Sequence, residues 1–433
     1  MDSMRLQTPR GTRDYLPADM VKRRRVIEKL RETFELYGYG EVTTPAFEYL
    51  ELLEAKAGED VREQIYWFKD KGGRKLGLRF EMTTPIARIV AQNPVMPKPI
   101  RFYYIQPVWR YEEPQRGRFR EFSHAGIELI GYEDVSADAE VIAVTVNALK
   151  KTGLDSIEVR LSDRRVLENL LIKYGMDRKL EESFRVLDKL ERKGKAYVIT
   201  ELNKLGIKKD NLDKLMSVIS IPGSNEEKLD MAEKCLSGTN GVGAIDRLRS
   251  ILDELKDGYG IASEVKIDYS IVRGLAYYTG MVFEVKTLKT PDLGSVAGGG
   301  RYDELIKTIG GPRIPATGMS IGIERLIEAL EIKGSLEINY SPAKVLVIPV
   351  GEEYWPHVLK LAEKLRNEGI PTIVEMKGRS LSAGLSHAER LKIPYAVIVG
   401  KREISTNSYT LRDLKEWKEV KLGLGELISK LKN

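Results

Sequence analysis

The residues from Arg110 to Gly131, RYEEPQRGRFREFSHAGIELIG, are the part of the sequence best suited to chemistry. Pro114 and Gly117 separate two runs of strand-forming residues, which predicts a hairpin with a basic loop. Because side chains alternate across a strand, Phe119, Ile127 and Leu129 would share an apolar face, and the opposite face of the returning strand would carry Arg118, Arg120, Phe122, His124 and Glu128. Unpaired charges are costly to bury, so the polar face is expected to meet a charged ligand in a cleft. A solvated face of an edge hairpin is the alternative interpretation.

A second polar pattern lies in LRFEMTT, residues 78–84, where Arg79, Glu81 and Thr83 stand at every second position. On a strand these three side chains would share one face. By itself the pattern is typical of an exposed strand face.

A glycine-bounded segment, VRGLAYYTG at residues 272–280, brings an arginine and two tyrosines together. Its glycines permit close backbone approach, so Arg273, Tyr277 and Tyr278 are candidates for contact with a ligand. Core packing is the usual role of tyrosines and would explain Tyr277 and Tyr278 as well.

Two further segments contain glycine near an arginine. GGGRYD, residues 298–303, predicts a glycine-rich turn that could approach a ligand, but it lacks the spacing of a phosphate-binding P-loop. In ATGMSIGIERL, residues 316–326, Arg325 stands where a strand is expected to run into a helix. A surface ion pair would also account for an arginine in that position.

Composition limits the classes of protein and site. The 433 residues are too many for one hydrophobic core, which suggests two or three domains. Cys235 is the single cysteine and there are three histidines, so neither an intrachain disulfide nor a dedicated His/Cys metal site is expected, although carboxylates could hold magnesium beside a bound phosphate. The net charge of +6 permits a polyanionic partner without requiring one. No apolar run approaches the roughly 18 residues that cross a bilayer, and the start lacks a secretory signal, so we expect a cytoplasmic protein without a membrane partner.

The chemistry-bearing residues must be positioned by a sheet. Helical periodicity first appears over residues 21–38, and aromatic and β-branched runs then predict antiparallel strands within 40–49, 62–70, 75–84, 98–112 and 118–131. Residues 164–260 show helical periodicity throughout, which indicates a helical insertion. Strand patterns return in residues 264–272, 281–288 and 316–322, so the sheet is expected to resume after the insertion.

The last part of the chain has a different pattern. Residues 335–342 read as a linker, and after them VLVIPV, TIVEM and YAVIVG alternate with helical patterns near Trp355–Arg366, Leu381–Leu391 and Leu424–Leu431. This alternation predicts a separate α/β domain of roughly 90 residues.

The motifs together resemble one family. The order of GTRDYLP, TPAFEY, LRFEMT, RYEEPQRGRFREF, RGLAYYTG, GGGRYD and GMSIGIERL is similar to that of the histidyl-tRNA synthetases, which are class II aminoacyl-tRNA synthetases. RGLAYYTG and GGGRYD together indicate the histidine branch. SLSAGLSHAERLKIPYAVIVG resembles the anticodon-binding domain that the histidine, proline, threonine and glycine enzymes share.

The resemblance implies an α/β fold whose catalytic domain is α+β. It implies a class II antiparallel sheet flanked by helices, with motifs 1 and 2 in residues 1–163 and the histidine motifs and motif 3 in residues 261–334. The helical insertion would occupy residues 164–260. After a linker at 335–342, residues 343–433 would form the anticodon-binding domain.

The implied activity is that of a histidine–tRNA ligase, which activates L-histidine with ATP to histidyl-adenylate and transfers the histidine to the 3′ end of tRNA(His). Mg²⁺ would accompany ATP, with protein ligands that the sequence does not identify. Motif 1, which includes Pro45, would form a homodimer.

The resemblance also assigns roles to individual residues. Arg110 and Arg273 would be catalytic, contacting the α-phosphate of ATP and the histidine carboxylate. ATP would further be bound by Glu112, Arg118, Phe122 and Arg325. The histidine pocket would comprise Glu81 and Thr83 at the α-ammonium, Glu128, Tyr277 and Tyr278 at the imidazole, and Arg110, His124 and Arg273.

Two positions depart from the family pattern, and two alternative functions stay open. Ala276 stands where many members have Asp, and His124 stands where Gln is common; imidazole can replace an amide as donor and acceptor. A regulatory paralogue from histidine biosynthesis is one alternative, but such paralogues lack the anticodon domain and usually lose RGLxYYTG. A class II synthetase for threonine, proline or glycine is the other, and the lack of a Cys/His zinc set argues against the threonine enzyme.

Overall fold

The structure is a computed structural model. It describes residues 6–55, 62–271, 277–338, 340–376 and 379–432, so Arg273, Ala276 and Lys377 lie outside the described residues. The chain divides into two compact units. Unit 1 comprises the residues up to Asp14 and Lys22–Leu336, and unit 2 comprises Tyr15–Val21 and Glu337–Asn433.

Unit 1 is built on an eight-stranded sheet. Its order is β1 (Gly40–Glu41), β5 (Ile100–Trp109), β6 (Glu121–Ile130), β11 (Ala316–Gly322), β10 (Ser295–Arg301), β9 (Met281–Thr287), β7 (Ile157–Asp163) and β8 (Val265–Ile267). All neighbouring pairs are antiparallel except β1–β5 and β7–β8 at the two edges. Strands from before and after the helical stretch therefore lie side by side, which confirms that the sheet resumes after residue 260.

The glycine-rich segment GGGRYD does not form the turn expected from its sequence. Gly298–Arg301 lie inside strand β10, in the middle of the sheet. A side-chain Cβ at Gly299 would stand 2.0 Å from the Gly318 carbonyl oxygen of β11. Glycine is needed here because neighbouring strands approach closely, and this requirement is invisible without the strand pairing.

A smaller, three-stranded antiparallel sheet precedes the hairpin. It pairs β2 (Phe47–Tyr49), β4 (Lys75–Leu78) and β3 (Trp67–Lys69), and α2 (Leu50–Glu54) follows β2. The predicted strand over residues 75–84 is wrong in its second half. β4 ends at Leu78, and Thr83 begins helix α4 (Thr83–Gln92) instead.

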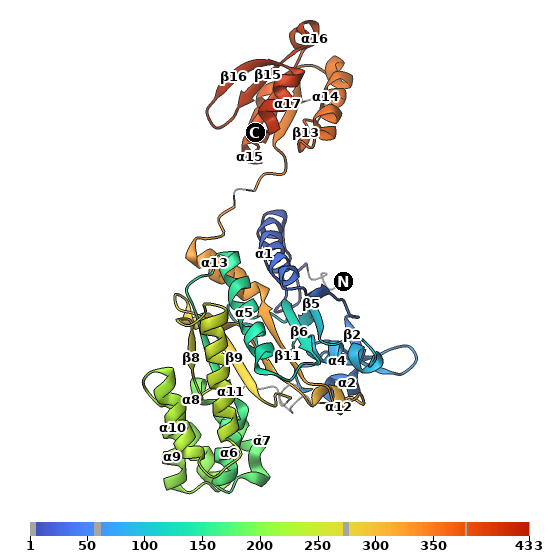
Figure 1. Ribbon diagram of the computed structural model, residues 1–433. Coiled ribbons are helices and arrows are strands. Elements are labelled where there is room, and N and C mark those ends of the chain that lie inside the picture. The colour runs from blue at the N-terminus through green and yellow to red at the C-terminus, as the bar shows by residue number, and fades with distance from the viewer. Residues whose placement is uncertain (1–5, 56–61, 272–276, 339, 377–378, 433) are drawn as a thin grey trace. The chain divides into compact units, whose positions relative to one another are not determined.

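Helices flank the large sheet (Figure 1). They are α1 (Pro17–Leu36), α4, α5 (Val135–Thr152), α12 (Leu305–Thr308) and α13 (Ile323–Lys333). The α5 helix is apolar along most of its length and ends at Gly153, whose φ of 100° terminates the helix in the left-handed region. The central strands and α5 are buried almost throughout, so the core of unit 1 lies between them.

The stretch of helical periodicity after β7 is helical in the structure. It contains α6 (Arg164–Lys173), α7 (Leu180–Leu187), α8 (Leu190–Leu205), α9 (Lys209–Ile219), α10 (Asn225–Leu236) and α11 (Val242–Asp253), with a short 3₁₀ turn at Asp177–Lys179 and a π turn at Glu254–Gly258. Figure 1 shows these helices gathered at the end of the sheet that carries β7, β8 and β9. Arg164, the first residue of α6, donates its backbone N–H to the Gly280 carbonyl at 3.0 Å, just before β9.

Unit 2 is an α/β domain with a mixed sheet. The sheet order is β13 (Thr372–Val374), β12 (Val345–Pro349), β14 (Tyr395–Val399), β15 (Ser408–Asp413) and β16 (Lys418–Gly423), and its helices are α14 (Trp355–Asn367), α15 (Leu381–Arg390), α16 (Lys401–Thr406) and α17 (Leu424–Lys432). The first three strands are parallel, and helices alternate with them as the α/β prediction requires. The antiparallel pair β15–β16 was not anticipated.

No helix within the described parts of the chain is both long and apolar enough to cross a membrane.

Candidate active site

One cleft in unit 1 collects most of the residues singled out from the sequence. It encloses about 600 Å³ and lies against strands β6, β10 and β11, with the loop between β5 and β6 and the first turns of α4 and α13 at its edges. Among the residues that line it are Glu81, Thr83, Arg110, Glu112, Arg118, Phe122, His124, Tyr277, Tyr278 and Arg325. Glu128 is not part of the lining, and Arg273 lies outside the described residues.

The hairpin predicted over residues 110–131 is present, but its second strand is shorter than expected. β6 begins at Glu121, so Arg118 and Arg120 belong to the loop and do not continue the alternation of the strand. Arg118 lines the cleft and pairs with Glu112 at 3.2 Å. Arg120 instead donates its backbone N–H to the Gly11 carbonyl at 2.7 Å, and its guanidinium lies 4.2 Å from the Tyr111 ring centre. The expectation that Arg120 faces a ligand is therefore wrong.

Arg110 stands at the end of β5 with its charged group directed toward the base of the hairpin. Its Nε donates to the Phe80 carbonyl at 2.9 Å, and its guanidinium lies 5.3 Å from the centre of the Phe122 ring. Burial lowers the pKa of Arg110, yet a guanidinium stays charged at any physiological pH. The site thus holds a fixed positive charge beside an aromatic face.

Arg325 enters the cleft from the opposite side, out of the first turn of α13. Its Nη1 donates to the Ser295 carbonyl at 2.8 Å and its Nε to the Gly117 carbonyl at 3.2 Å. Burial and the neighbouring charges of Arg118 and Arg110 lower the pKa of Arg325. Three arginines that repel one another favour a polyanionic ligand between them.

Glu128 lies on the polar face of β6, and the hydroxyl groups that it bonds belong to residues that line the cleft. It is 1% exposed and accepts hydrogen bonds from Tyr302 Oη at 2.5 Å and from Thr83 Oγ1 at 3.0 Å, with Tyr104 Oη at 3.4 Å. Burial raises the pKa of the Glu128 carboxyl to about 8. This buried acid, surrounded by hydroxyl groups, suits a small polar ligand that offers N–H donors.

Tyr302 and Tyr104 line the cleft and were missed as site residues. The sequence signal for Tyr302 is its place in GGGRYD, directly after the glycines and the arginine. Tyr104 faces the site only because β5 pairs with β6, where it stands opposite Gly126. That glycine leaves room for the ring, since a Cβ at Gly126 would lie 2.4 Å from Tyr104 Oη.

Glu81 and Thr83 reach the cleft by a different route from the one predicted. Glu81 precedes α4, and its carboxylate accepts from the backbone N–H groups of Thr83 at 2.5 Å and Thr84 at 2.9 Å, which caps the helix. Burial raises the pKa of Glu81. Arg79 does not join them: its Nη1 donates to the Thr44 and Pro45 carbonyls at 2.6 and 3.0 Å.

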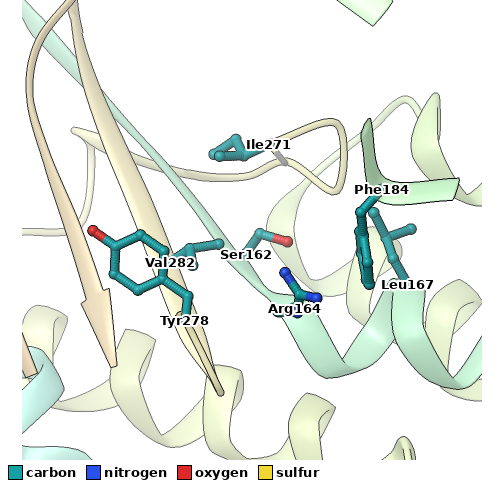
Figure 2. Close-up of a pocket in the computed structure, with 7 residues that line it drawn as sticks. All are labelled: Ser162, Arg164, Leu167, Phe184, Ile271, Tyr278 and Val282. Carbon is teal, nitrogen blue, oxygen red and sulfur yellow. The ribbon is translucent and has the colours of Figure 1, made fainter. Parts of the chain in front are cut away.

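Tyr277 and Tyr278 lie against each other with ring centres 4.9 Å apart, and Tyr277 is 5.9 Å from Tyr302. Both belong to a buried apolar cluster, which confirms the core interpretation, and both also line the cleft. On the far side of Tyr278 is a hollow of about 10 Å³ (Figure 2), where the ring turns away from Arg164 and Phe184. That space suits no more than a single water molecule and is too small for a substrate.

His124 lines the cleft next to Phe122, with ring centres 5.1 Å apart. It stands on β6 opposite Gly322 of β11 and Gln106 of β5. The structure therefore brings this departure from the family pattern to the cleft wall. Ala276, the other departure, is outside the described residues.

The described residues contain no group of three or more His, Cys, Asp or Glu side chains placed to hold a metal ion. Glu112, Glu284 and Asp292 are among the carboxylates that line the cleft.

Comparison with known proteins gives consistent matches over nearly the entire chain. Residues 11–326 match the family model described as histidyl-tRNA synthetase, and residues 344–433 match the model described as anticodon binding domain. The chain is 40% identical over 430 residues to the histidine–tRNA ligase of Pyrococcus furiosus and 41% identical over 435 residues to that of Thermococcus kodakarensis, covering 99% of both chains in each case. The crystal structure of histidyl-tRNA synthetase from Nostoc sp. PCC 7120 superimposes with a TM-score of 0.83 at 27% identity, covering 99% of each chain.

Proposed function

The chain belongs to the histidyl-tRNA synthetase family, and from that premise we propose which residues of its cleft carry each part of the reaction. The family's reaction has two steps: histidine and ATP form histidyl-adenylate and pyrophosphate, and the histidine then passes to tRNA. The chain is accordingly an ATP-dependent aminoacyl-tRNA ligase, not a regulatory paralogue or a synthetase for threonine, proline or glycine.

One observation carries the residue assignments. A wall of three arginines, Arg110, Arg118 and Arg325, shares a cleft with the hydroxyl groups that surround a buried carboxylate, Glu128. The arginines suit the phosphates of ATP, and the hydroxyl groups around the Glu128 carboxyl suit an imidazole. A single cleft with both groups of residues can bring the histidine carboxylate to the α-phosphorus.

We assign ATP to the side of the cleft formed by the hairpin loop and α13. Arg118 and Arg325 would bind phosphate oxygens, Phe122 would stack on the adenine, and Glu112 would accept a hydrogen bond from its amino group. Mg²⁺ would arrive with ATP, and Glu284 and Asp292, which are among the carboxylates that line the cleft, would supply protein oxygen ligands. The ion would neutralise charge on the phosphates.

We assign histidine to the side formed by α4, β6 and β10. Glu81 and Thr83 would hold the α-ammonium, while Glu128 and Tyr278 would address the imidazole nitrogens, with Tyr277 and His124 completing the pocket. A pocket of buried polar groups rejects an apolar amino acid by about 10⁴-fold, because its donors and acceptors are then left unpaired.

Activation then requires no protein nucleophile. The histidine carboxylate attacks the α-phosphorus and expels pyrophosphate, while Arg110 and Arg273 would stabilise the charge that develops on the α-phosphate. The role of Arg273 rests on its position in RGLAYYTG.

We also propose the partners of the enzyme. Unit 2 would bind tRNA(His), with phosphate contacts from exposed basic residues such as Arg390, Lys392, Lys401 and Arg402. The enzyme would act in the cytoplasm, where its tRNA is charged.

A homodimer is the assembly we propose. The residues after Pro45 form β2, and the small sheet exposes Phe47, Tyr49 and Trp67 at 49%, 51% and 55%. Grouped exposed aromatic side chains favour a protein interface. Sedimentation should give twice the chain mass of 49.0 kDa at micromolar concentration, and a 49.0 kDa species throughout would exclude the dimer.

Amino-acid-dependent exchange of pyrophosphate into ATP tests the assignment of the cleft. Among the twenty natural amino acids, histidine alone should support exchange in the wild-type enzyme, and Arg325→Ala should raise the KM for ATP more than that for histidine. Exchange with threonine, proline or glycine, or an unchanged KM for ATP in the variant, would contradict the residue roles.

A further inference from the structure

We propose that Arg23 is a positioning residue for ATP, acting from helix α1 through Glu324 on Arg325. The inference rests on the ATP-binding role proposed for Arg325. It concerns a buried contact that joins three segments far apart in the sequence: α1, the start of β6 and the first turn of α13.

The contact lies where strand β11 ends. β11 pairs with β6 as far as Gly322 opposite His124, and α13 begins at the next residue, so strand pairing stops before Ser123. Beyond this point the side chain of Glu324 bonds the β6 backbone in place of strand pairing, because its Oε2 accepts from the Ser123 backbone N–H at 2.9 Å. The side chain of Glu324 is only 3% exposed, so a buried carboxylate links α13 to β6.

Arg23 supplies the opposite charge to this buried carboxylate. Its Nη1 donates to Glu324 Oε1 at 2.7 Å and its Nη2 to Ser123 Oγ at 2.6 Å. The Arg23 side chain is 12% exposed, so water screens the pair weakly. Both arms of the guanidinium are therefore used to hold the ends of two different elements.

The neighbours of this contact are residues proposed to bind ATP. Arg325 follows Glu324 in the same turn, and Phe122 precedes Ser123 and lies beside Arg110. A shift of the first turn of α13 or of the start of β6 would displace Arg325 or Phe122. Glu128, by contrast, is five residues further along β6 and is held by Thr83 and Tyr302, so the histidine pocket should be affected less.

The chain offers a matched control for this contact. Lys22 and Glu331 form an ion pair at 2.6 Å between the same two helices, but their side chains are 27% and 43% exposed. Glu331 lies seven residues beyond Glu324, away from the start of α13. Lys22→Met therefore removes an α1–α13 ion pair without touching the residues beside Arg325.

The test measures pyrophosphate exchange in Arg23→Met, Arg23→Lys, Lys22→Met and Arg325→Ala, with ATP titrated at saturating histidine and histidine titrated at saturating ATP. We expect Arg23→Met to raise the KM for ATP by about tenfold, the scale of one lost charged hydrogen bond, with the KM for histidine changed less than about twofold. Arg23→Lys keeps the charge but not the two-armed geometry, so its KM for ATP should be intermediate. Lys22→Met should leave both constants near those of the wild type.

Several outcomes would overturn the inference. Equal increases in the two KM values for Arg23→Met, or a KM for ATP no different from that of Lys22→Met, would mean that Arg23 only stabilises the fold. Arg23→Lys is the second variant in case Arg23→Met fails to fold. If Arg23→Lys has both the thermal midpoint and the KM for ATP of the wild type, the positive charge alone suffices and the two-armed geometry does not position Arg325. An unchanged KM for ATP in Arg325→Ala would instead overturn the proposed role of Arg325, and the inference with it.

Discussion

At the scale of single residues, Gly318 leaves the space that the Glu128 side chain occupies. A Cβ at this position would lie 1.7 Å from Glu128 Oε2 and 2.7 Å from the Ile127 carbonyl oxygen. Gly318→Ala should therefore displace Glu128 and lower the free energy of unfolding by about 1–3 kcal/mol. Gly322→Ala on the same strand is the control, since its nearest neighbour stands 3.9 Å away and the change should stay below about 1 kcal/mol. Urea unfolding measures the free energy of unfolding of both variants, and an equal decrease in the two would contradict the steric argument.

Glu128 should also make stability depend on pH. Its pKa rises from the usual 4.5 to about 8 in the folded protein, so between these values the native state binds a proton that the unfolded state has released. The contribution of Glu128 to the free energy of unfolding should thus fall as pH rises from 4.5 to 8. Glu128→Gln removes the titration, so its thermal midpoint relative to the wild type should increase from pH 5 to pH 8. A constant difference across that range would show that Glu128 keeps an ordinary pKa.

At the scale of elements, the start of α4 combines a stabilising contact with a proposed role in histidine binding. Glu81 caps this helix through the Thr83 and Thr84 N–H groups, and it is also proposed to hold the histidine ammonium. Glu81→Ala should lower the free energy of unfolding by about 0.5–2 kcal/mol, the usual cost of losing a cap. Glu81→Gln keeps one acceptor oxygen, so it can bond only one of these two N–H groups, and it loses the charge.

The two Glu81 variants should therefore separate the two roles. Thermal unfolding should distinguish them, with the midpoint of Glu81→Gln between those of Glu81→Ala and the wild type, while the KM for histidine in pyrophosphate exchange should rise in both. If Glu81→Gln is destabilised as much as Glu81→Ala, a single acceptor oxygen does not support the start of the helix.

At the scale of the whole molecule, activation and tRNA recognition should be separable. Unit 1 contains every residue proposed for adenylation, and unit 2 has apolar clusters of its own around β12 and β14. Deleting residues 341–433 should spare histidine-dependent pyrophosphate exchange and strongly reduce aminoacylation and tRNA affinity. The affinity of the full chain for tRNA should also fall with added salt.

Circular dichroism would first establish that the truncated chain is folded. Loss of exchange from a folded truncation would show that unit 2 is needed for activation. Unchanged aminoacylation would show that unit 2 does not recognise tRNA.

By itself the sequence determined the elements whose pattern is local. The 3.6-residue periodicity of residues 164–260 predicted helices there, and the alternation of β6 placed Phe122, His124 and Glu128 on one face. The order of the short motifs also identified the family, because it depends only on residue types along the chain.

Only the tertiary structure decided features that depend on contacts between distant segments. Arg79, Glu81 and Thr83 alternate as on a strand, but the capping of α4 by Glu81 overrides that pattern. GGGRYD looks like a turn, yet close approach of β11 makes its glycines part of a strand. Tyr302 reaches Glu128, and Arg23 reaches Glu324, across 174 and 301 residues of sequence. No local pattern encodes such pairs, because the free energy of each contact depends on the burial and geometry that the completed sheet provides.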